Sequence, residues 1–103
     1  YEPDLYLKMP GNPLIPQIPD YSILRDDGSP VYIEMLGMME IDNYRRNWEN
    51  KKELYRYNSI EMGKNLICFS SEGRSFNYPI IEAVLKNFII KGEIPNAEVS
   101  LDF

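Results

Sequence analysis

Two short apolar runs on either side of an Asp-Gly turn constrain the fold of this chain more than any other feature. The first run covers residues 19–25, the second is VYIEML at 31–36, and the segment DDGSP lies between them. Asp-Gly between β-branched, apolar runs is a strong signal for a β-hairpin. A connecting loop with an odd number of residues would place Asp20 and Glu34 on the same face of this hairpin.

The second run of the hairpin is a strand with two different faces. Side chains alternate between the faces of a strand. One face receives Val31, Ile33 and Met35, and the other receives Tyr32, Glu34 and Leu36. Glu34 therefore shares its face with large apolar side chains.

A helix is predicted after the hairpin, from about Asp42 to Asn58, with Asp42 as its N-cap. The residues expected to face the sheet, at spacings of four, three and four, are Tyr44, Trp48, Lys51 and Tyr55, with Leu54 beside them. Lys51 is the one charged member of this stripe, while Lys52 points away from the sheet. We interpret Trp48 and Tyr55 as packing residues.

The N-terminal segments are predicted to be extended. Residues 1–8 alternate from Asp4 onward, as in a short strand, and the proline-rich residues 9–18 are expected to form an extended connector or an irregular edge. With 103 residues, the chain is expected to form a single domain. Because it begins at Tyr1 and not at methionine, we expect it to be a fragment of a longer protein.

The C-terminal half completes an α/β pattern. Residues 65–69 form an almost entirely apolar run, which is typical of a strand buried on both faces. A second helix is predicted over 78–90, with Pro79 in its first turn and Gly92 as its stop signal. The final segment, AEVSLDF, is expected to add an edge strand.

Composition excludes several classes of function. The chain has no histidine, which removes Ser-His-Asp triads, histidine-ligated zinc and nucleases with a histidine base. The single cysteine, Cys68, allows no internal disulfide, and we expect it to be a buried small hydrophobe. The net charge of −5 argues against binding nucleic acid by bulk electrostatics, but it leaves open a catalytic module next to a domain that supplies affinity.

No apolar run approaches the length of a membrane span, and no signal-peptide pattern is present in this sequence. We therefore expect an intracellular location, cytoplasmic or nucleoid-associated, with no membrane partner.

Asp20, Glu34 and Lys51 form the candidate site. Two carboxylates, with the backbone carbonyl of Met35 and waters, suit Mg²⁺, which prefers oxygen ligands. Lys51 would orient or deprotonate the attacking water and offset negative charge on a phosphate. Singly, each residue also has a structural interpretation: Glu34 as a solvated strand residue and Lys51 as a side chain that passes the aromatic rings to reach solvent. Their joint placement favours the site.

Four segments of the sequence resemble one known superfamily. They are PDYSI, VYIEMLG, NYRRNWENKKELY and GKNLICF, and they are similar to the PD-(D/E)xK, or restriction-endonuclease-like, nucleases. The resemblance implies a DNA endonuclease that depends on Mg²⁺, with Mn²⁺ as a substitute, and that uses Asp20 and Glu34 as metal ligands. It also implies a core in αβββαβ order, a mixed four-stranded sheet flanked by two helices, whose first helix is absent from this fragment.

The lysine departs from the usual family pattern. The family lysine usually stands two residues after the acid, where this chain has Leu36. In a sub-pattern of the family the lysine comes from the following helix, and Lys51 matches that place, with Lys52 as the fallback. Glu2 is a possible accessory residue.

Further contacts to DNA are expected from arginines. They are Arg45, Arg46, Arg56 and Arg74. Charges along a helix are also what its solvated face carries. Two other readings of the whole chain remain: an inactive module of the same fold that binds DNA or a partner within a larger DNA-processing protein, and a small structural domain. If the chain cleaves DNA, a homodimer is a plausible form of it.

Overall fold

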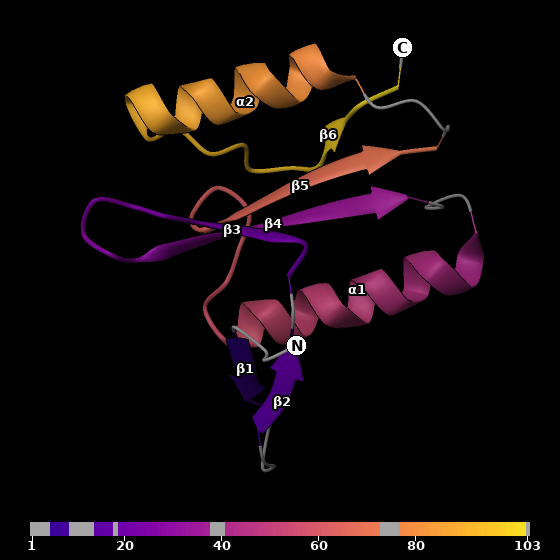
Figure 1. Cartoon of the computed structure of the whole chain (residues 1–103). Coiled ribbons are helices and arrows are strands. Elements are labelled where there is room, and N and C mark those ends of the chain that lie inside the picture. Colours follow the sequence, from indigo (N-terminus) through magenta and orange to yellow (C-terminus); the bar gives the residue numbers. More distant parts are fainter. Residues whose placement is uncertain (1–4, 9–13, 18, 38–40, 73–76, 103) are drawn as a thin grey trace.

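A mixed four-stranded sheet separates the two helices of this chain (Figure 1). The computed structural model describes residues 5–8, 14–17, 19–37, 41–72 and 77–102. The elements in chain order are β1 (Leu5–Lys8), β2 (Leu14–Gln17), β3 (Tyr21–Leu24), β4 (Pro30–Gly37), α1 (Asp42–Tyr57), β5 (Leu66–Ser71), α2 (Tyr78–Lys91) and β6 (Val99–Ser100). The predicted α/β class, with a mixed four-stranded sheet and two helices, is confirmed.

The predicted hairpin is present as β3 and β4, which pair antiparallel. Leu24 lies opposite Pro30, so the loop covers residues 25–29 and has an odd number of residues. Gly28 in this loop has φ 87°, a conformation that glycine adopts without strain. The register ends with Tyr21 opposite Ile33, and Asp20 immediately before β3 accepts a hydrogen bond from the N–H of Met35, the residue after Glu34.

The rest of the sheet is parallel, in the order β3-β4-β5-β6. Strand β5 pairs parallel to β4, with Glu34 opposite Cys68, and parallel to β6. The connection from β4 to β5 runs through α1, the usual way to link parallel neighbours. The predictions of a doubly buried β5 and a C-terminal edge strand are confirmed.

Each face of the sheet carries its own apolar core, and the strand alternation predicted for β4 is confirmed. The core under α1 contains Leu7, Tyr32, Leu36, Trp48, Tyr55, Ile60, Leu66 and Cys68. The core under α2 contains Val31, Ile33, Ile67, Phe69, Phe88 and Leu101. Adjacent residues of β4 thus enter different cores.

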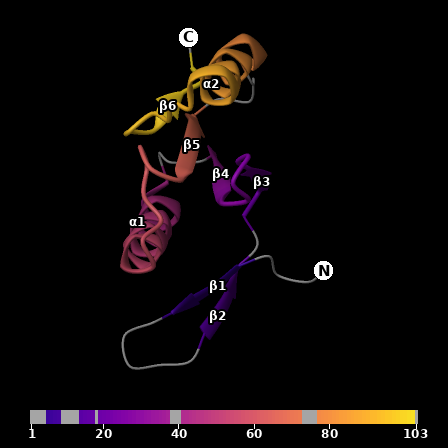
Figure 2. The ribbon, with the colours of Figure 1, turned by 90° about the vertical axis from the view of Figure 1, so that its left-hand side faces the viewer.

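The N-terminal strands differ from the prediction. The connector over 9–18 contains a strand, β2, which pairs antiparallel with β1 in a separate two-stranded sheet (Figure 2). The four-stranded sheet is completed by β6 and not by the N-terminal strand. Pro16 is tolerated in β2 because each strand of a two-stranded sheet has an outer edge where no N–H is needed. Leu7 of β1 still enters the core under α1.

The helix ends confirm one prediction and correct another. The N-cap of α1 is Ile41, with no capping side chain, so the prediction of Asp42 as N-cap was wrong. Asp42 lies instead in the first turn, where its negative charge interacts favourably with the positive end of the helix dipole. In α2, the Asn77 side chain accepts a hydrogen bond from the Ile80 N–H, and Gly92 ends the helix with φ 70°. The predicted stop at Gly92 is confirmed.

Candidate active site

Glu34 is the buried centre of the candidate site. Its position on β4 turns the side chain towards α1, and only 4% of the residue is exposed. The hydroxyl of Tyr55 donates a hydrogen bond to Oε1 of Glu34. Nζ of Lys51 lies 3.0 Å from the same oxygen. A buried carboxylate is costly unless it is paired and hydrogen-bonded, and both conditions are met here.

Lys51 reaches Glu34 because α1 directs this lysine towards the sheet. The ammonium also lies 5.5 Å from the centre of the Tyr55 ring, within the range of a cation–π contact. The side chain of Lys51 is 29% exposed, so this lysine contacts both the buried carboxylate and the solvent. Because Lys51 and Tyr55 are four residues apart on one helix, they lie on one face of it.

Lys52 has different partners. Its Nζ lies 3.1 Å from Oε2 of Glu49 and 3.9 Å from Oε1 of Glu98. The two neighbouring lysines are thus separated by the helical rotation, and Lys51 is the one that contacts Glu34. The aromatic stripe of α1 correctly predicts that Lys51 faces the sheet. Lys52, however, does not point away from it as predicted, because it is as exposed as Lys51 and lies near Glu98, next to β6.

Asp20 lies at the other side of the hairpin, immediately before β3. Its Oδ2 accepts a hydrogen bond of 2.7 Å from the backbone N–H of Met35, which ties the carboxylate to β4 one residue beyond Glu34. The negative charge of Asp20 is also one cause, the smallest, of the raised pKa of Tyr55. Asp20 is exposed, whereas Glu34 is buried, so the two carboxylates differ in access to solvent.

Tyr55 contacts Glu34 at the candidate site, although the sequence predicts only a packing role for this residue. Burial raises the pKa of its hydroxyl far above the ordinary range, and the hydrogen bond and charge of Glu34 raise this pKa further. The hydroxyl is therefore a permanent donor that holds the carboxylate. The i, i+4 spacing to Lys51 is the signal that points to it in the sequence.

Cys68 lies on β5 opposite Glu34 and is buried, as predicted. Burial, followed by the charge of Glu34, raises the pKa of the thiol to about 12. The thiol is therefore neutral at physiological pH, and a neutral thiol is a poor nucleophile and metal ligand.

The donors near Glu34 fit a magnesium ion in kind. Asp20 and Glu34 offer hard carboxylate oxygens, and Mg²⁺ is commonly bound by one or two carboxylates together with waters and substrate phosphate. Within the described residues, no group of three histidine, cysteine, aspartate or glutamate side chains gathers at one point. The protein would thus supply two side-chain ligands. Met35 would add its carbonyl, and its N–H already positions Asp20.

The remaining predicted residues lie away from Glu34 or outside the described residues. Arg45, Arg46 and Arg56 are exposed on α1, and Arg56 pairs with Glu53 at 2.7 Å. Glu2 and Arg74 lie outside the described residues.

Comparison of this chain with protein-family models, curated proteins and solved structures gives no match. In the part of the chain that the structure describes, no helix is both long and apolar enough to cross a membrane.

Proposed function

We propose that this chain is a metal-dependent nuclease domain that hydrolyses phosphodiester bonds in DNA. The proposal assigns it a restriction-endonuclease-like core, of the PD-(D/E)xK type, in which the lysine comes from the helix after the acidic strand. The observation that carries the proposal is the pair of Lys51 and Glu34 at 3.0 Å, with Asp20 immediately before the neighbouring strand β3 and bonded to the Met35 N–H. Carboxylates that can hold a metal ion and a cation that reaches solvent are groups that support phosphodiester hydrolysis.

In the proposed mechanism, Asp20 and Glu34 would hold Mg²⁺, or Mn²⁺ in its place. The bound ion would polarise the phosphate and lower the pKa of a water that attacks it. Lys51 donates hydrogen bonds from its ammonium to the substrate phosphate and offsets its growing negative charge. Tyr55 is a positioning residue, because its hydroxyl holds Glu34 and does not reach the solvent.

The chain has a net charge of −5, which by itself would repel the phosphates of DNA. Two of the negative charges, Asp20 and Glu34, belong to the proposed metal site, where the ion compensates them. The exposed arginines of α1 offer contacts to the DNA backbone, which position a duplex without reading its sequence. The rest of the affinity would come from another domain or from a second copy of the chain.

One observation favours a second candidate function, a non-catalytic module of the same fold that binds DNA or a protein partner. Oε1 of Glu34 already has two partners, Lys51 and Tyr55. Such a network also holds a helix on a sheet without any metal. In this second candidate, the same residues act only in stability.

Nicking of supercoiled plasmid in the presence of Mg²⁺ or Mn²⁺ separates the two functions. We expect metal-dependent nicking by the unchanged chain, and a loss of at least about 100-fold in Glu34→Gln and in Lys51→Met. Lys52→Met is the matched control and should retain activity. Absence of nicking by a folded chain, together with no binding of Mn²⁺ in calorimetry, would favour the non-catalytic module.

A further inference from the structure

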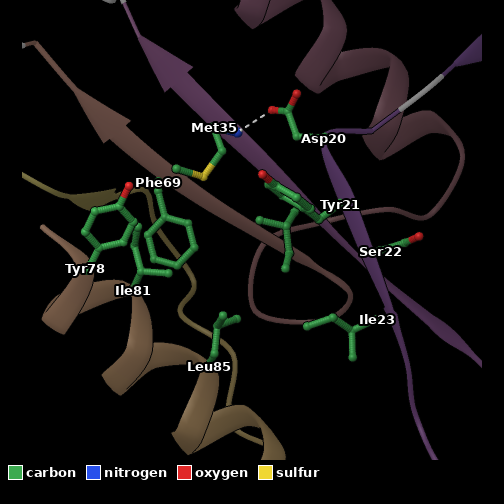
Figure 3. Close-up of a pocket in the computed structure, with 10 residues that line it drawn as sticks. Asp20, Tyr21, Ser22, Ile23, Met35, Phe69, Tyr78, Ile81 and Leu85 are labelled. Atoms are coloured by element: carbon green, nitrogen blue, oxygen red, sulfur yellow. Dashed lines mark hydrogen bonds between the residues drawn. The ribbon is translucent and has the colours of Figure 1, made fainter. Parts of the chain in front are cut away.

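A pocket of about 700 Å³ opens on the α2 side of the sheet, between β3 and α2 (Figure 3). Its size is that of a small-molecule site. Ile33, Met35 and Phe69 come from β4 and β5, Tyr21 and Ile23 from β3, and Tyr78 from the start of α2. Figure 2 shows that α2 lies nearest to β5 and β6, whereas β3 is the edge strand at the other side of the four-stranded sheet.

Two tyrosine rings stand at the rim of this pocket, which we call the Tyr21–Tyr78 pocket. Tyr21 is 64% exposed and Tyr78 is 71% exposed, although both line the cavity. They come from opposite sides, one from β3 and one from α2 (Figure 3). Large aromatic rings exposed beside an apolar cavity are the surfaces on which nucleic-acid bases stack.

Charge argues for a base in this pocket and against a phosphate. Among the described residues that line it, Asp20 alone carries a charge, and that charge is negative. A phosphate would be repelled there, whereas a neutral, planar, largely apolar group would not. Tyr21 and Tyr78, which line the pocket, also carry hydroxyl groups that can contact the polar edge of a base.

Asp20 connects the pocket to the proposed nuclease site. It lines the pocket, and its carboxylate accepts a hydrogen bond from the N–H of Met35, the residue after Glu34. β3 is an edge strand of its sheet, so a DNA strand can pass around it from the α1 face of the sheet to the α2 face. A DNA strand that places one phosphate at Asp20 and Glu34 would therefore have a neighbouring base within reach of the pocket, provided that this base is not paired.

We propose that the Tyr21–Tyr78 pocket binds an unpaired base next to the phosphate that is cleaved. This inference rests on the proposed nuclease function and narrows its substrate to single-stranded DNA or to DNA with a locally unpaired or flipped base. The cost of unstacking is smallest where the base is already single-stranded, so such DNA is the preferred ligand.

The test measures binding without cleavage. A fluorescein-labelled single-stranded oligonucleotide is titrated in Ca²⁺ or EDTA, and fluorescence anisotropy reports Kd for the chain and for Tyr21→Ala, Tyr78→Ala and Tyr57→Ala. We expect each pocket substitution to weaken binding about 5- to 150-fold, and the Phe substitutions at the same positions to restore it, because stacking needs the ring and not the hydroxyl. Tyr57, also largely exposed but on α1, is the control and should leave Kd unchanged.

The same experiment distinguishes failure of this inference from failure of the nuclease proposal. Metal-dependent nicking combined with a Kd that is equal in the chain, Tyr21→Ala and Tyr78→Ala would overturn the pocket and keep the nuclease. Tyrosine-dependent binding without any nicking would keep the pocket as a base-binding site and overturn both the nuclease proposal and the place of the base beside a cleaved phosphate. A concentration-dependent dimer that dissociates in Tyr21→Ala and binds no oligonucleotide would identify the pocket as an interface between two copies, and so overturn the inference.

Discussion

Lys51 on α1 and Glu34 on β4 form an ion pair of 3.0 Å in which the carboxylate is buried and the ammonium reaches solvent. The pair connects two elements that follow each other in the chain. It also gives the site an internal control, because Lys52 lies beside Lys51 and bonds to other carboxylates.

Lys51→Met should destabilise the fold more than Lys52→Met. The first substitution leaves Glu34 buried with Tyr55 as its remaining partner, and we expect it to lower the free energy of unfolding by about 1–3 kcal/mol. The second removes a more exposed ion pair, for which we expect less than about 1 kcal/mol. Urea unfolding of both variants measures the difference. Equal decreases in the free energy of unfolding of the two variants would mean that the Lys51–Glu34 pair contributes no more to stability than the exposed pair of Lys52.

Tyr55→Phe should remove a dependence of stability on alkaline pH. The pKa of Tyr55 is raised in the folded chain, so above about pH 10 the unfolded chain loses this proton while the folded chain keeps it. The unfolded state then binds fewer protons, and stability falls by about 1.4 kcal/mol per pH unit. This fall should be present in the unchanged chain, and the contribution of Tyr55 should be absent in Tyr55→Phe. Urea unfolding between pH 8 and pH 11 measures it; identical pH profiles would contradict the raised pKa.

Cys68 should resist thiol reagents as long as the chain is folded. The thiol is buried, and its pKa of about 12 leaves almost no thiolate at pH 8. Labelling with Ellman's reagent should be slow in native buffer and complete in guanidinium chloride, which serves as the control. Rapid, stoichiometric labelling of the native chain would show that β5 is accessible.

Asp20→Asn should separate the structural role of Asp20 from its proposed role as a metal ligand. The amide oxygen can still accept the hydrogen bond from the Met35 N–H, so we expect a change in stability within about 0.5 kcal/mol. Loss of the charge should weaken Mn²⁺ binding by at least about 10-fold in calorimetry. Asp26→Asn in the hairpin loop is the exposed control. Unchanged Mn²⁺ affinity in Asp20→Asn would remove Asp20 from the metal site.

Local patterns in the sequence determined which way the main side chains face. Strand alternation assigned Glu34 to one face of β4, and the helical stripe turned Lys51 towards the sheet. The prediction that Lys52 points away from the sheet is not confirmed, because Lys52 lies 3.9 Å from Glu98, next to β6. The Asp-Gly turn predicted the hairpin, and the odd loop that aligns Asp20 with Glu34 entered only as a condition. These features repeat over two to four residues, so a short stretch of sequence is enough to specify them.

Tertiary structure alone decided which strands pair and which side chain completes the Glu34 network. The N-terminal strand β1 is not part of the four-stranded sheet but pairs with β2, and the fourth strand of that sheet is β6, beside β5. Tyr55, an apparent packing residue, meets Glu34 through its hydroxyl. Neither outcome follows from local periodicity, because strand partners compete across the whole chain and a hydroxyl finds its acceptor only when helix and sheet are packed together.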